Sequence, residues 1–119
     1  MSQLISLQQA IDMTTLYRAQ KENILAPGYK DQNILAICET FDRSVFDTVL
    51  AQEGCAGLRI YYGMDTSLKV HAIVVGVNDK DEDMLPPESI QAGGGEGSII
   101  EDGNRCPDLC PPVSPLNNP

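Results

Sequence analysis

Leu58-Arg-Ile-Tyr-Tyr62 and Leu68-Lys-Val-His-Ala-Ile-Val-Val-Gly-Val77 are the two stretches of the 119-residue chain that decide its fold. The first alternates its side chains with a period of two residues, which is typical of a half-buried β-strand. The second is almost wholly apolar, as in a central strand covered on both faces. Residues 63–67 between them include a glycine and an aspartate and have the length of a hairpin loop. Together the stretches predict an antiparallel β-hairpin.

A first helix is predicted over residues 6–23. Ser6 and Gln9 have the spacing of a capping box, in which two backbone N–H groups are satisfied reciprocally. Side chains at steps of three and four residues predict one buried stripe on this helix: Leu7, Ala10, Ile11, Thr14 and Tyr17.

A second helix is predicted over residues 43–52. Asp42 before it is a residue type favoured at the N-cap. Phe41 has the spacing to pack on Phe46 as a hydrophobic staple. Gly54 is well placed to end the helix, because glycine adopts the left-handed conformation without steric cost.

These elements predict a small α+β fold. We expect two helices packed on an antiparallel β-hairpin, or on a sheet of three to four strands. Residues 1–78 form the compact domain in this prediction. Residues 79–119 form an acidic, Gly- and Pro-rich C-terminal tail that is extended and available for docking.

Most of the negative charge lies in the tail. The formal net charge is −9; residues 1–78 hold eight acidic and six basic side chains, and residues 79–119 hold nine and two. Such a chain repels phosphates and anionic lipids, so we expect neither nucleic acid nor membrane as a partner. The sequence shows no leader pattern and no apolar run of the roughly 18 residues that a membrane span requires, which predicts a cytoplasmic protein.

The most distinctive motif is Cys106-Pro-Asp-Leu-Cys110. A close pair of cysteines can bind a soft metal as thiolates or form a local disulfide under oxidation. Cys38 and Cys55 lie alone in apolar surroundings, where cysteine is most often a core residue. In a cytoplasmic chain, thiols or ligands are expected more often than structural disulfides. Cys106 and Cys110 are therefore the candidate metal or thiol-redox pair, and no cofactor is predicted.

His71, the single histidine, lies inside the most apolar strand. No His, Cys or Asp spacing motif surrounds it, which favours a hydrogen-bonded structural role over a general base or a metal ligand. The acidic run 79–83 lacks the glycine and the glutamate that complete a calcium loop. The Gly-rich run 93–97 lacks the lysine and hydroxyl residue of a phosphate loop and is predicted to be a flexible link.

Tyrosine and arginine are enriched at protein interfaces, and several of them cluster on or near the hairpin. The predicted contact patch consists of Tyr17, Arg59, Tyr61 and Tyr62. Apolar residues of the tail are the predicted anchors for docking: Ile99, Ile100, Leu109, Val113 and Leu116.

The leading prediction is a small non-enzymatic protein-interaction module. Its tail would dock on its own domain, on a second copy in a homodimer, or on a larger protein partner. Two alternatives stay open. One is a thiol-redox or metal-binding protein that uses Cys106 and Cys110, and the other is a small ligand-binding domain or enzyme with a pocket near His71.

Overall fold

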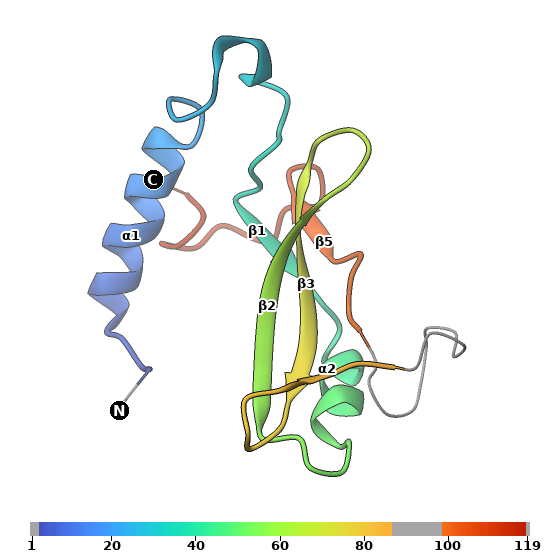
Figure 1. The fold of residues 1–119 in the computed structure, drawn as a ribbon. Helices are drawn as coiled ribbons and strands as arrows, with labels where there is room; N and C mark the ends of the chain where they lie inside the picture. Colours follow the sequence, from blue (N-terminus) through green and yellow to red (C-terminus); the bar gives the residue numbers. More distant parts are fainter. Residues whose placement is uncertain (1–2, 87–98, 119) are drawn as a thin grey trace.

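The computed structural model describes residues 3–86 and 99–118, which form a small α+β fold (Figure 1). In chain order the elements are α1 (Leu7–Gln20), the 3-10 turn η1 (Pro27–Tyr29), β1 (Cys38–Thr40), α2 (Arg43–Leu50), β2 (Gly57–Met64), β3 (Val70–Val77), β4 (Asp83–Met84) and β5 (Asn104–Cys106). The predicted α+β class, with two α-helices on antiparallel strands, is confirmed. The Gly-rich run 93–97, predicted to be a link, lies outside the described residues.

The predicted capping box is formed at the start of α1. Ser6 Oγ accepts from the Gln9 N–H at 3.0 Å, and Gln9 Oε1 accepts from the Ser6 N–H at 2.9 Å. The predicted buried stripe is wrong, since no side chain of α1 is fully buried and Leu7 is 65% exposed. The reason is that α1 stands off from the sheet (Figure 1) and reaches the chain before β1 by a hydrogen bond from the Tyr17 hydroxyl to the Ala36 carbonyl, at 2.6 Å.

α2 is fixed by its apolar side. Asp42 is its N-cap residue, and Phe41 lies against Phe46 with ring centroids 5.8 Å apart, so the predicted hydrophobic staple is present. Val49 on the same helix is completely buried. After the helix, Gly54 adopts φ = 86°, a conformation that glycine reaches without strain.

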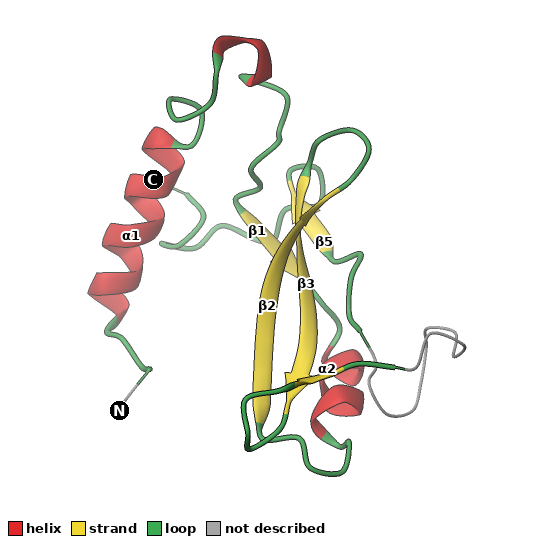
Figure 2. Ribbon diagram, viewed as in Figure 1, coloured by secondary structure: helices red, strands yellow, loops and turns green. Residues whose placement is uncertain are grey.

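The predicted hairpin is confirmed. β2 and β3 pair antiparallel in unbroken register, from Gly57 opposite Val77 to Met64 opposite Val70. Figure 2 shows β2 and β3 side by side. β4 pairs with the other side of β3, so the strand order is β2–β3–β4. β1 and β5 form a separate two-stranded sheet.

The edge of β3 that faces away from β2 is completed by several short segments. Three of its backbone N–H groups each donate at 2.8 Å to a different segment: Val70 to the Ile34 carbonyl, Ala72 to Glu39 Oε1 and Val74 to the Ile100 carbonyl. The next residue in this alternation, Gly76, pairs with Met84 of β4. Because a buried N–H group must be hydrogen bonded, these segments are held where β3 needs acceptors.

Residues 99–118 are part of this arrangement. Ile100 exchanges two backbone hydrogen bonds with Val74, both of 2.8 Å, and its side chain is 6% exposed within the hydrophobic core. Farther along, the guanidinium of Arg18 in α1 donates to the Leu116 carbonyl at 2.6 Å. The described part of the predicted tail therefore lies against the sheet and against α1 (Figure 1).

A buried arginine secures β5. Arg105 is 8% exposed; its Nε donates to the Val70 carbonyl at 2.9 Å, and its Nη2 donates to the Asn33 and Ile34 carbonyls, both at 3.0 Å. A buried guanidinium is stable only where its N–H groups find acceptors. Arg105 thus ties β5 to the start of β3 and to the chain that leads into β1.

Replacing Ile100 with alanine is expected to lower the free energy of unfolding by about 2–4 kcal/mol, because a buried side chain is lost and a cavity is left. Ile99, the adjacent residue of the same type, is 42% exposed. Ile99→Ala is the matched control and should change stability by less than about 0.5 kcal/mol. Urea denaturation measures both, and equal effects would contradict the placement of Ile100 in the core.

Arg105→Met is expected to destabilise the protein by at least about 2 kcal/mol, since three carbonyl oxygens lose a charged donor. Arg43→Met is the control, because the Arg43 side chain is 91% exposed. The control should alter the free energy of unfolding by less than about 0.5 kcal/mol. Indistinguishable denaturation midpoints for the two variants would show that the hydrogen bonds of Arg105 contribute no stability.

Candidate functional site

An apolar groove of about 550 Å³ lies between α1 and one face of the β2–β3 hairpin. Tyr17 lines it from α1, Ile60 and Tyr62 from β2, and residues 35–39 from the start of β1 and the chain before it. Its volume falls within the roughly 300–1,000 Å³ typical of binding pockets. The groove is the candidate functional site.

The register of the hairpin determines which side chains face the groove. Ile60 and Tyr62 lie opposite Val74 and Ala72, so these four side chains share one face of the sheet. α2 covers this face near Gly76, where the Val49 side chain is closely packed. Away from α2 the face is open, with Ile60 54% exposed and Tyr62 81% exposed.

Three carboxylates surround His71, which also lines the groove. Its Nε2 lies 2.7 Å from Asp65 Oδ2, and its Nδ1 lies 3.5 Å from Glu101 Oε1 and 3.7 Å from Glu39 Oε2. The Glu39 side chain is 10% exposed and also accepts the Ala72 N–H, so it joins the sheet to the histidine. His71 is thus a hydrogen-bonded part of the fold in an acidic setting.

Asp65 is held as a carboxylate by its neighbours. The hydrogen bond with His71 is the main cause that lowers the pKa of the Asp65 carboxyl below its usual value. The backbone N–H groups of Lys69 and Ser67, at 3.1 and 2.8 Å from Oδ1, shift the pKa in the same direction.

A second polar cluster lies farther along the hairpin, on the face opposite Ile60 and Tyr62. Arg59 binds Asp81 Oδ1 at 2.5 Å and Asp83 Oδ1 at 2.6 Å, and the Tyr61 hydroxyl donates to Asp83. The hydrogen bonds from Tyr61 and from Arg59 lower the pKa of the Asp83 carboxyl, and the bond to Asp83 raises the pKa of Tyr61. The acidic turn after β3 is therefore folded onto this face.

The predicted contact residues are divided between the two faces. Tyr17 and Tyr62 line the groove together. Arg59 and Tyr61 lie on the opposite face with the acidic turn, because successive side chains of a strand point to opposite sides. Two of the four residues are thus brought together at the groove.

The predicted anchors of the tail are also divided. Ile100 lies in the core, while Ile99 and Leu109 are 42% and 61% exposed. Val113 is 75% and Leu116 is 39% exposed. Ile100 alone among these five packs in the core.

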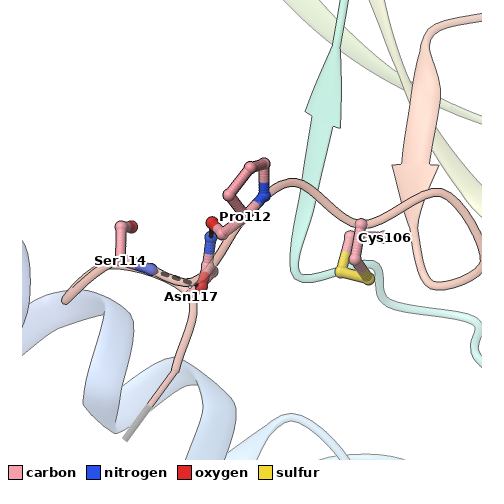
Figure 3. Close-up of a disulfide and its surroundings, with 5 residues drawn as sticks. Cys106, Pro112, Ser114 and Asn117 are labelled. Carbon is pink, nitrogen blue, oxygen red and sulfur yellow. Dashed lines mark hydrogen bonds between the residues drawn. A yellow bond between two sulfur atoms is a disulfide. The ribbon is translucent and has the colours of Figure 1, made fainter.

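Cys106 and Cys110 are joined by a disulfide (Figure 3), where thiols or ligands had been the expectation. In this state neither residue offers a thiolate to a metal. Within the described part of the chain, no group of three or more His, Cys, Asp or Glu has the arrangement of a metal site. Cys55 packs against the core cluster, and Cys38 lines the groove.

The backbone edge of β2 borders the groove. Among the described residues β2 is the outermost strand of its sheet. Val74 uses both its N–H and its carbonyl to bind Ile100, so Ile60 opposite it directs its own N–H and carbonyl outward, away from β3. Every second residue of β2 does the same. The strand contains neither proline nor lysine, the residues that commonly protect an exposed edge.

Sequence reasoning missed Glu39 and Arg105, whose roles depend on contacts with distant segments. It also missed the outward edge of β2. A local signal for the two faces did exist, because strand alternation alone separates Tyr61 from Tyr62.

Neither α-helix in the described residues has the length and apolar character needed to cross a membrane. Comparisons of the chain with protein families, with curated proteins and with solved structures found no match.

His71→Leu is expected to raise the pKa of Asp65 toward its ordinary value near 3.9, because the hydrogen bond that lowers it is removed. A carboxyl with a depressed pKa in the folded state stabilises the fold above its unfolded pKa, and this stabilisation is lost as the pH falls through the folded pKa. The variant should therefore lose less stability than the wild type on acidification below about pH 4.

NMR titration of the carboxyl carbons measures this shift directly. Asp83 is the internal control, since its pKa is lowered by Tyr61 and Arg59 and not by His71, and it should stay low in the variant. An unchanged titration of Asp65 would contradict the assignment.

Proposed function

We propose that this protein is an interaction module that binds an extended segment of a partner protein along the edge of β2. The observation that carries the proposal is an unprotected strand edge beside an apolar groove. In strand addition, backbone hydrogen bonds supply affinity and alternate side chains supply specificity. The added strand would therefore place every second side chain on each face of the sheet.

The groove face favours apolar side chains in the partner. Ile60 and Tyr62 are largely exposed there, and Tyr17 faces them from α1. Exposed apolar surface of this kind, gathered around a concavity, is typical of a contact site rather than of a scattered surface. Two or three apolar side chains of an added strand would remove this surface from water.

The opposite face favours basic side chains. Arg59 is matched there by the carboxylates of both Asp81 and Asp83, so the cluster keeps a net negative charge. The run 79–83 holds four acidic residues and one lysine. Together with the chain's net charge of −9, this would steer a basic segment to the edge. The favoured partner thus alternates apolar and basic residues.

A second copy of the chain is a poorer occupant. Pairing β2 with β2 would bring two acidic turns and two chains of net charge −9 together. Like charges brought close oppose association. A small apolar molecule is the other competitor, because the groove has the volume of a ligand pocket.

The peptide Lys-Val-Lys-Val-Lys-Val-Lys is a suitable probe, with Glu-Val-Glu-Val-Glu-Val-Glu as its charge-reversed control. We expect the basic peptide to shift the backbone amide resonances of β2, at Ile60 and Tyr62 among others, in a ¹⁵N NMR titration. Tyr62→Ala should weaken binding about tenfold, a loss of about 1.4 kcal/mol. Tyr29→Ala, which changes an exposed tyrosine that does not line the groove, should leave binding unchanged.

Three results would contradict the proposal. One is equal binding of the two peptides, and another is the absence of shifts at the β2 amides. The third is concentration-dependent dimerisation in sedimentation that Tyr62→Ala abolishes, which would make a second copy the occupant. Shifts confined to His71 and the groove side chains would instead favour a small ligand.

A further inference from the structure

We propose that Cys38, Cys106 and Cys110 form a thiol–disulfide exchange site. In this site the Cys38 thiolate displaces Cys110 from the Cys106–Cys110 disulfide. The inference rests on the β1–β5 ladder and does not depend on the proposed binding function.

The ladder brings the third cysteine to the disulfide. Cys38 lies directly opposite Cys106 in the antiparallel register of β1 and β5. Directly opposite residues project to the same face, with Cα atoms about 4.5–5.5 Å apart. A disulfide spans Cα separations of about 4.4–6.8 Å, so a Cys38–Cys106 bond fits the ladder as it stands.

The three cysteines differ in solvent exposure, and this difference gives each sulfur atom its role in the exchange. Cys106 is 3% exposed and therefore shielded from thiols in solution, whereas Cys110 is exposed. Cys38 is a free, half-buried cysteine that lines the groove. Because an external thiol is kept from Cys106, the neighbouring Cys38 is the thiol placed to attack it, and Cys110 is placed to leave into solvent.

The exchange balances without another reagent. Cys38 loses its proton and forms an S–S bond with Cys106 Sγ, while the Cys106–Cys110 bond breaks. The electron pair of that bond leaves with Cys110, which takes up a proton. One disulfide is consumed and one is formed, so no net oxidation or reduction occurs.

The two disulfides constrain the chain differently. The Cys106–Cys110 bond closes a loop with a sequence separation of 4. A Cys38–Cys106 bond would join β1 to β5 and close a loop of about 70 residues. Longer loops restrict the unfolded chain more, so the exchanged form is expected to be the more resistant of the two to unfolding.

Exchange would also release the segment after β5 from its covalent anchor. Asn117 holds this segment in a turn of its own: its Nδ2 donates to the Pro112 carbonyl at 3.1 Å, and its Oδ1 accepts from the Ser114 N–H at 3.0 Å (Figure 3). A Cys110 thiol freed at the surface could then react with a low-molecular-weight disulfide such as oxidised glutathione.

The test maps disulfides in the full-length folded protein. The protein is incubated at pH 6, 7 and 8, quenched in acid, alkylated and digested with trypsin without reductant. Cleavage at lysine and arginine puts Cys38 in peptide 31–43, Cys55 in peptide 44–59, and Cys106 with Cys110 in peptide 106–119. We expect a linked pair of peptides 31–43 and 106–119 that is alkylated at Cys110. Its rate of formation should rise with pH, because the thiolate is the attacking species in thiol–disulfide exchange.

Two variants serve as controls. Cys38→Ser should abolish the linked pair, and Cys55→Ser should leave it unchanged. With oxidised glutathione added, Cys110 should be glutathionylated in the wild type and at least tenfold less in Cys38→Ser. Cys38 alkylated at every time point, with peptide 106–119 always internally bridged, would overturn the proposal. Linkage of peptide 44–59 in place of 31–43 would overturn it too, because it would show unspecific scrambling.

Discussion

The structure depends on the hydrogen bonding of one strand edge. β3 has no exposed residue, and its Val74 and Val75 are 1% and 2% exposed. Its N–H groups on the side away from β2 cannot turn to water and must find acceptors within the chain. These acceptors come in turn from the Ile34 carbonyl, the Glu39 carboxylate, Ile100 and the two-residue strand β4. This requirement places segments that are far apart in the sequence beside one another.

The position of the Arg105 side chain is set by the same need for hydrogen-bond partners. Once Ile34 and Ile100 are fixed against β3, the carbonyls of Val70, Asn33 and Ile34 converge on the position of its guanidinium. The charge is stable there because every one of these oxygens accepts from it. The segment after residue 98 therefore contributes to the fold although its composition is that of an extended tail.

The sequence predicted those features that depend on near neighbours. The β2–β3 hairpin, the Ser6 capping box and the staple of Phe41 on Phe46 all follow from spacings within a few residues. β1 and β5 were beyond such reasoning, because strands of three residues carry no periodicity and their pairing joins residues more than sixty positions apart. The buried stripe expected on α1 failed for a related reason: periodicity finds an apolar side of a helix but not what covers it.

The candidate site was only partly predictable for the same reason. Alternation along β2 could separate Tyr61 from Tyr62, but it could not show that the acidic turn takes Arg59 and Tyr61 as partners. The two edges of the sheet then differ sharply. The β3 edge is completed by four segments, whereas the β2 edge, with Ile60 and Tyr62 beside it, is left open in the described chain. Within the described residues, several segments complete one edge of the sheet and none completes the other. The open edge exposes backbone groups that a partner strand can satisfy, and the uncovered apolar side chains lie on the same border.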